Sequence, residues 1–212
     1  MLKRKTERNS LLASCIGVVA FIVLYYLATL LYPGGSQADK TMKGFSWINN
    51  YWCNLLNETA INGEHNSARP VAMAAMLILG LSMLLFWYQL PLVLPAGKWY
   101  NSVRFTGIVS TVVSMFIFTS WHDRVIDISG LLGLFALLAT LTGLYKKKIY
   151  GLFIMGCCAL ALCGVNYYMA LYRSLLLHLP VVQKITFLYF LLWIFLINLL
   201  ALRTIKYPKE NS

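Results

Sequence analysis

Charged residues are scarce in this sequence, and the acidic ones are the scarcest. Only 12% of the 212 residues are charged, and seven aspartates and glutamates stand against 18 lysines and arginines. Soluble domains carry about 25% charged residues, so the composition excludes an ordinary water-soluble fold. The basic excess would suit a nucleic-acid-binding protein. However, the lysines and arginines lie at the ends of apolar runs rather than on one soluble face, so we expect no nucleic-acid partner.

The sequence also lacks the motifs that identify common sites. Its five cysteines include no C-x-x-C pair, so neither a disulfide framework nor a cysteine zinc site is indicated. The H-E-x-x-H zinc motif, the P-loop, the dinucleotide-binding glycine pattern and the G-x-S-x-G nucleophile motif are all missing. No enzyme class is indicated by a motif, and whether the protein is an enzyme stays open at this stage.

Long uncharged runs take the place of charge. A transmembrane helix needs about 20 apolar residues to cross roughly 30 Å of hydrocarbon. Six segments meet or approach this length, at residues 11–32, 70–90, 105–121, 125–145, 149–171 and 185–202. Pro91 and Pro95 end the second segment, and Pro180 breaks the chain before the sixth. We predict an all-α fold, with residues 1–212 forming a single transmembrane domain built as a six-helix bundle.

The lysines and arginines divide unequally between the two sides of this bundle. Twelve fall on the side that carries both termini and six on the other, and an excess of basic residues marks cytoplasmic loops. Lys146, Lys147 and Lys148 share one very short loop and give the strongest single indication. We therefore expect a multi-pass protein of the cell membrane, in contact with membrane lipids, whose N-terminus and C-terminus are cytoplasmic.

One long connection, residues 33–69, is extracytoplasmic in this topology. Along residues 45–58, Ile48, Tyr51 and Leu55 fall on one helical face, and Asn50 and Asn54 fall on the other. This spacing predicts an amphipathic helix that lies at the membrane interface or folds over the bundle. Asparagine offers a donor and an acceptor without charge, which suits recognition of a polar headgroup or sugar. Alternatively, the loop is a lid whose asparagines bond to its own backbone.

The histidines share one side of the predicted bundle. All three, His65, His122 and His178, are extracytoplasmic in this topology. Asp123 and Asp127 are four residues apart where the fourth helix is predicted to begin, so they would share a face. An ionisable residue in a membrane helix is a functional candidate by default. The structural alternative is that the first aspartate caps the helix and the second pairs with a nearby arginine.

These residues support two hypotheses about function. The first is an extracytoplasmic polar pocket that binds or senses a lipid headgroup or a small polar ligand, with arginines suited to a phosphate. Its candidate ligand-binding residues are Asn50, Asn54, Glu58, Arg69, Asn166 and Arg173. The alternative is a metal-dependent membrane hydrolase of a lipid-like substrate, with zinc as the candidate cofactor. Its candidate metal ligands are His65, His122 and His178, and its candidate catalytic residues are Asp123 and Asp127.

Three short stretches resemble an uncharacterised family of six-helix prokaryotic membrane proteins, a domain of unknown function grouped with the damage-regulated autophagy modulator type. They are Asn50-Tyr51-Trp52-Cys53-Asn54-Leu55, Asn66-Ser67-Ala68-Arg69-Pro70 and His122-Asp123. The resemblance covers nearly the whole chain and implies a six-helix bundle with no established activity.

A more distant similarity is to the superfamily of alkaline ceramidases and progestin/adiponectin receptors. These are seven-helix membrane hydrolases with a His/Asp zinc site. The chain departs from that pattern because it has six predicted spans and lacks paired histidines on the last one, with His178 standing alone before it. The departure weighs against carrying over a zinc amidase activity.

Overall fold

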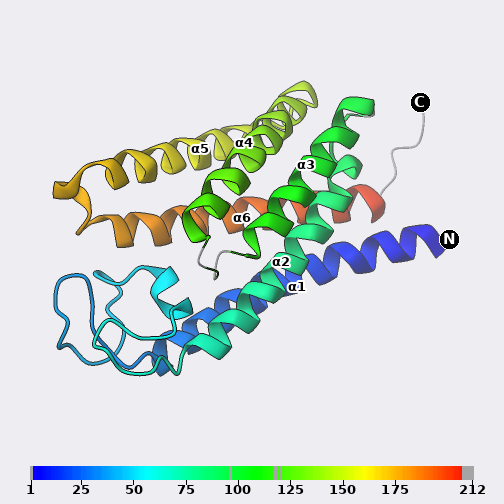
Figure 1. The fold of residues 1–212 in the computed structure, drawn as a ribbon. Coiled ribbons are helices and arrows are strands. Elements are labelled where there is room, and N and C mark those ends of the chain that lie inside the picture. The colour runs from blue at the N-terminus through cyan, green and yellow to red at the C-terminus, as the bar shows by residue number, and fades with distance from the viewer. Residues whose placement is uncertain (1, 96, 117–118, 120, 207–212) are drawn as a thin grey trace, which may run out of the picture. The chain divides into compact units, whose positions relative to one another are not determined.

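The structure, a computed structural model, describes residues 2–95, 97–116, 119 and 121–206. Within these residues there are six α-helices and no strand (Figure 1). They are α1 (Leu2–Leu31), α2 (Arg69–Gln89), α3 (Lys98–Ser114), α4 (His122–Lys146), α5 (Tyr150–Leu171) and α6 (Leu179–Lys206). The predicted all-α fold is confirmed.

Five of these helices are long and apolar enough to cross a membrane. The spans are Arg4–Leu31, Arg69–Leu92, Arg124–Lys146, Tyr150–Leu171 and Leu179–Ile205. The chain is therefore an integral membrane protein. Helix α3, with 17 residues, is not one of the five. The third predicted span, residues 105–121, includes residues 117, 118 and 120, which lie outside the described part of the chain.

The helices extend beyond the apolar runs that predicted them. Helix α1 begins at Leu2 rather than at residue 11, because a helix continues its backbone hydrogen bonds into its polar flank. Helix α6 begins at Leu179, so Pro180 lies in its first turn and does not break the chain before it. Proline is tolerated there because the N–H that it lacks would have no partner within the helix.

The chain divides into two compact units, each assembled from segments far apart in the sequence. Unit 1 comprises Met1–Val19, Leu77–Cys157 and Leu192–Ser212, and unit 2 comprises Ala20–Met76 and Cys158–Leu191. Helices α1, α2, α5 and α6 contribute residues to both units.

Unit 1 contains a buried polar node between three helices. The Ser14 hydroxyl on α1 donates to the Ser82 carbonyl on α2 at 2.8 Å and accepts from the Asn198 amide on α6 at 2.9 Å. All three residues are buried. Gly17 lies so close to Ser82 that an added Cβ would overlap the serine side chain. Small residues and interhelical hydrogen bonds of this kind hold helices together in lipid.

Unit 2 contains the long connection between α1 and α2, residues 32–68, which we call the cap and which runs from blue to cyan in Figure 1. The amphipathic helix predicted over residues 45–58 was wrong. That stretch holds only the short 3-10 helix η1 (Trp52–Leu56). Asparagine side chains that bond to nearby backbone groups compete with helix formation, and the cap uses its asparagines in this way.

Candidate functional site

Asn50 is the first of two buried asparagines that hold the cap in shape. Its side chain is fully buried. The amide nitrogen donates to the Gly35 carbonyl at 2.9 Å, and the amide oxygen accepts from the Ser46 backbone N–H at 2.8 Å. Asn50 therefore joins two turns of the cap, and both ends of its amide are occupied.

Asn66 is the second, and it makes more bonds than any other side chain described in the cap. Its amide nitrogen donates to the carbonyls of Asn54 at 3.1 Å, Leu55 at 3.2 Å and Asn57 at 2.8 Å. Its oxygen accepts from the Ala68 N–H at 3.2 Å. These bonds fasten the end of η1 to the start of α2. The side-chain oxygen of Asn54 in turn accepts from the Tyr51 backbone N–H at 2.7 Å.

These contacts bear on the ligand-binding role predicted for Asn50 and Asn54. Both side chains are buried and both bond to cap backbone. This geometry favours the interpretation of the cap as a lid whose asparagines satisfy its own backbone, because a buried polar group needs such a partner. Neither amide is therefore free to receive a ligand while the cap is closed.

Aromatic packing fixes the cap against α1 and α6. The Trp52 ring meets Phe21, Tyr25 and Phe187 edge-on, with centroid distances between 5.3 and 6.2 Å. The Tyr25 hydroxyl donates to the Trp52 carbonyl at 3.2 Å. The backbone N–H of Trp52 donates to the Gln183 side-chain oxygen on α6 at 3.4 Å. Burial of such large aromatic rings contributes strongly to the stability of the contact between the cap and these two helices.

Lys184, on α6, is the unusual residue of this region. Its side chain is only 5% exposed, and its ammonium donates to the Asn50 carbonyl at 2.6 Å. The nitrogen also lies 5.9 Å from the centre of the Phe45 ring. No carboxylate in the described part of the chain forms an ion pair with it. A lysine ammonium has three N–H donors. The described partners of this buried charge are one neutral carbonyl, that of Asn50, and one aromatic ring, that of Phe45.

Cys53 lies close enough to Lys184 for the ammonium to affect the ionisation of the thiol. Burial raises the pKa of the Cys53 thiol, and the neighbouring Lys184 ammonium opposes that rise. Burial is the larger effect, so the thiol stays protonated at neutral pH. Since the thiolate is the reactive form, Cys53 should react slowly while the cap is closed.

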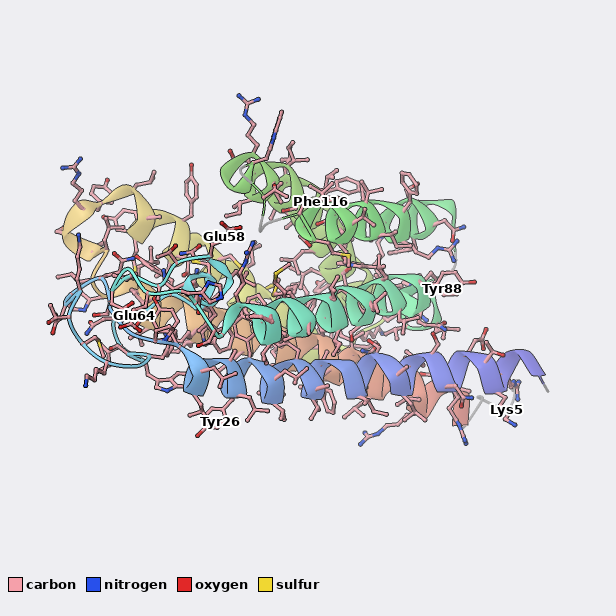
Figure 2. The ribbon with its side chains drawn as sticks, turned by 60° about the horizontal axis from the view of Figure 1, so that its bottom comes forward. Lys5, Tyr26, Glu58, Glu64, Tyr88 and Phe116 are labelled. Atoms are coloured by element: carbon pink, nitrogen blue, oxygen red, sulfur yellow. The ribbon has the colours of Figure 1, made fainter. Side chains whose placement is uncertain are left out.

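The structure joins two other predicted residues, Glu58 and Arg69. The Arg69 guanidinium lies 2.9 Å from the Glu58 carboxylate. Glu58 begins a short hairpin in which its carbonyl accepts from the Asn66 N–H at 3.0 Å and Thr59 bridges to His65. The His65 side chain is exposed on this hairpin. Figure 2 labels Glu58 and Glu64 on these loops.

The remaining candidates are scattered. Asn166 bonds to the Leu162 carbonyl and to the Thr186 hydroxyl, while the Arg173 and His178 side chains are exposed. These belong to unit 2, as does His65, whereas His122, Asp123 and Asp127 belong to unit 1.

The proposed metal and catalytic residues are only partly described. Asp127 is exposed, and the side chains of His122 and Asp123 lie outside the described residues. Among the side chains that are described, no group of three or more histidines, cysteines or acids is placed to hold a metal ion. The histidine triad and the two aspartates therefore stay predictions.

Sequence reasoning missed Lys184, although a signal was present. It is the sole charged residue between Arg173 and Arg203, and an isolated charge in an apolar helix marks a functional candidate. The predicted sixth span began at residue 185, which put Lys184 in a loop among other extracytoplasmic lysines. Helix α6 begins five residues earlier than Lys184, at Leu179, and carries it inside.

Comparison of the chain with models of protein families, with curated proteins and with solved structures finds no match.

Proposed function

We propose that the cap binds or senses the anionic headgroup of a membrane lipid and that Lys184 receives it. The observation that carries this proposal is a buried ammonium whose partners are all neutral, the Asn50 carbonyl and the Phe45 ring. Keeping a charge buried without a counter-ion is costly, and proteins retain such groups mainly where they have a function.

A phosphate is a better partner for this ammonium than the carbonyl it now has. Hydrogen bonds between two charged groups are roughly twice as strong as those involving neutral groups. An anionic oxygen that approached Lys184 would therefore compete with the Asn50 carbonyl for it.

The position of Lys184 along α6 suits a lipid ligand. It lies five residues after Leu179, where the helix begins, which corresponds to a rise of about 7 to 8 Å. Helix α6 has 28 residues and a length of about 42 Å, about 12 Å more than a hydrocarbon core of about 30 Å. With this excess shared between its two ends, Lys184 is near the level where headgroups meet hydrocarbon. The distribution of lysines and arginines predicts that this end is extracytoplasmic, so the lipid would belong to the outer leaflet.

Sensing follows from the same contact. Because the Lys184 ammonium holds the Asn50 carbonyl, a headgroup that takes the ammonium removes one bond between the cap and α6. The cap then opens more often, and Cys53, which is half-buried in the closed cap, becomes more accessible to reagents in water. A ligand shifts such an equilibrium by the difference in its affinity for the two states.

Cys53 alkylation tests the proposal directly. The protein is placed in nanodiscs of phosphatidylcholine, with or without phosphatidylglycerol, and treated with a sulfonated, membrane-impermeant maleimide. We expect phosphatidylglycerol to raise the labelling rate of Cys53 in the wild type and not in Lys184→Met. Lys43→Met is the matched control, because Lys43 is an exposed cap lysine, and it should respond as the wild type does.

Two further arms make the outcome unambiguous. Inorganic phosphate added to phosphatidylcholine nanodiscs tells a free anion from a lipid headgroup, and Cys53→Ser identifies the labelled residue. A labelling rate that is the same in both lipid mixtures and with phosphate, or that responds equally in Lys184→Met, would overturn the proposal.

A further inference from the structure

We infer that one corner of the cap, residues 45–48, lies in the bilayer interface and contacts phospholipids of the adjacent leaflet. We call these residues the corner. The inference goes beyond headgroup binding and does not depend on it, because it concerns a different surface and a different kind of contact.

The corner is tied to the surface of a membrane-spanning helix. The Trp47 ring stacks on the Tyr26 ring with 6.2 Å between the centroids and 28° between the planes. Tyr26 belongs to the span Arg4–Leu31, and its side chain projects outward from α1 (Figure 2). The two side chains are both well exposed, Trp47 at 44% and Tyr26 at 53%. Trp47 therefore covers part of the outward face of α1 and is itself uncovered.

The depth of this contact follows from helix geometry. The apolar run of α1, residues 11–31, has a length of about 32 Å, which matches a hydrocarbon core of about 30 Å. The helix end at Leu31 therefore marks the edge of the hydrocarbon. Tyr26 lies five residues before that end, so its Cα is about 7 to 8 Å below the edge. Since Trp47 stacks on Tyr26, the corner reaches below the edge as well.

The chemistry of the corner suits this depth. Ile48, next to Trp47, is 66% exposed, and burying such a side chain in an apolar medium is favourable by about 1.5 to 3 kcal/mol. Tryptophan is enriched at membrane interfaces because its ring is apolar and its N–H is polar. Lys43, an exposed residue just before the corner, has a long stem that allows its ammonium to reach the headgroup level.

Phospholipid is the molecule that contacts the corner, because the corner continues the lipid-facing surface of α1. Leu27 and Leu30 on the same helix are also exposed, and in a membrane-spanning helix such residues meet acyl chains. Trp47 and Ile48 extend this apolar surface from the helix onto the cap. The edge-on contact of Phe45 with Trp47, at 5.6 Å, supports the ring from the cap side.

Quenching by brominated lipids measures whether Trp47 is in the bilayer. The protein is placed in nanodiscs of phosphatidylcholine brominated either in the upper part of the acyl chain or near its methyl end. Tryptophan fluorescence is compared in the wild type, Trp47→Phe and Trp52→Phe. Trp52 is the matched control because it belongs to the cap but is buried inside it. Iodide, a quencher confined to water, is applied to the same samples.

We expect Trp47→Phe to lose a component that upper-chain bromine quenches more strongly than methyl-end bromine and that iodide does not reach. Trp52→Phe should keep this component. Trp47→Tyr preserves a stacking ring and gives a second variant in case the phenylalanine disturbs the fold.

If both Trp47 variants are quenched by bromine as the wild type is, Trp47 is not in contact with lipid and the inference fails. If the lost component is instead quenched by iodide, the corner lies in water, and the inference fails in the same way. Lys184→Met should retain the Trp47 component, so failure of headgroup binding and failure of the lipid contact are distinguishable.

Discussion

Replacing Asn66 by alanine should open the cap more than any other single change to its polar side chains. The fully buried Asn66 amide donates to the carbonyls of Asn54, Leu55 and Asn57 and accepts from the Ala68 N–H. Alanine removes all four bonds and leaves the backbone groups without that partner.

The size of the effect can be worked out from the carbonyls that lose their partner. Asn54 O also accepts from a backbone N–H, whereas the Leu55 and Asn57 carbonyls make no other hydrogen bond within the described residues. Leu55 is buried, whereas Asn57 is exposed, so water can replace the lost bond at Asn57. One buried polar group left unsatisfied costs about 1 to 3 kcal/mol. A cost in this range raises the population of the open cap by about fivefold to a hundredfold.

The labelling rate of Cys53 by a membrane-impermeant maleimide reports this population. Cys53 is half-buried in the closed cap, where burial raises the pKa of its thiol and slows its reaction. The labelling rate follows the open fraction when the cap closes again faster than the reagent reacts. Asn49→Ala is the matched control. Asn49 is a half-buried cap asparagine whose side-chain amide makes no hydrogen bond in the described part of the chain.

We expect Asn66→Ala to be labelled about fivefold to a hundredfold faster than the wild type and Asn49→Ala to stay close to it. If the two variants differ by less than about threefold, the hydrogen bonds of Asn66 do not hold the cap and the reasoning is refuted.

Three further predictions concern the helices and the candidate metal site. Gly17→Ala should destabilise the protein by about 1 to 3 kcal/mol, because the added methyl group clashes with Ser82. Gly164→Ala, whose methyl group meets no other atoms, should be neutral or stabilising, and thermal unfolding in detergent measures both variants. Asn198→Leu should cost about 0.6 to 2 kcal/mol in the same assay, through the lost interhelical bond, and a gain in stability would contradict this. The hydrolase hypothesis predicts near-stoichiometric zinc in the purified protein and its loss in His122→Ala; a wild type that stays metal-free after incubation with zinc would exclude it.

The sequence predicts the apolar helices well because hydrocarbon imposes a length on them. The run that predicts the fifth span, residues 149–171, agrees with α5 (Tyr150–Leu171) to within a residue. The ends of a helix are less predictable where the polar residues beside the apolar run are also helical. Hydropathy marks where the hydrocarbon ends, not where the helix does, and this difference hid Lys184 inside α6.

The cap was mispredicted for a different reason. Helical spacing of apolar residues and asparagines predicts an amphipathic helix, but the asparagines bond to backbone groups that a helix would have used. Partners such as Gly35 for Asn50, or Asn57 for Asn66, are set by the way the loop closes and not by local spacing. Only Trp52–Leu56 forms a helical turn, and Asn50 is buried instead of facing a ligand.

The way the cap is held also determines the conditions in which it can fold. The distribution of lysines and arginines predicts that the cap is extracytoplasmic, and small domains there commonly rely on disulfides. Residues 32–68 contain one cysteine, Cys53, so no disulfide can form within them. Its shape rests on amide hydrogen bonds, aromatic rings and one lysine, none of which depends on redox state. The cap should therefore reach the same fold in cell-free synthesis under strongly reducing conditions as in an oxidising compartment, with no oxidant or disulfide isomerase.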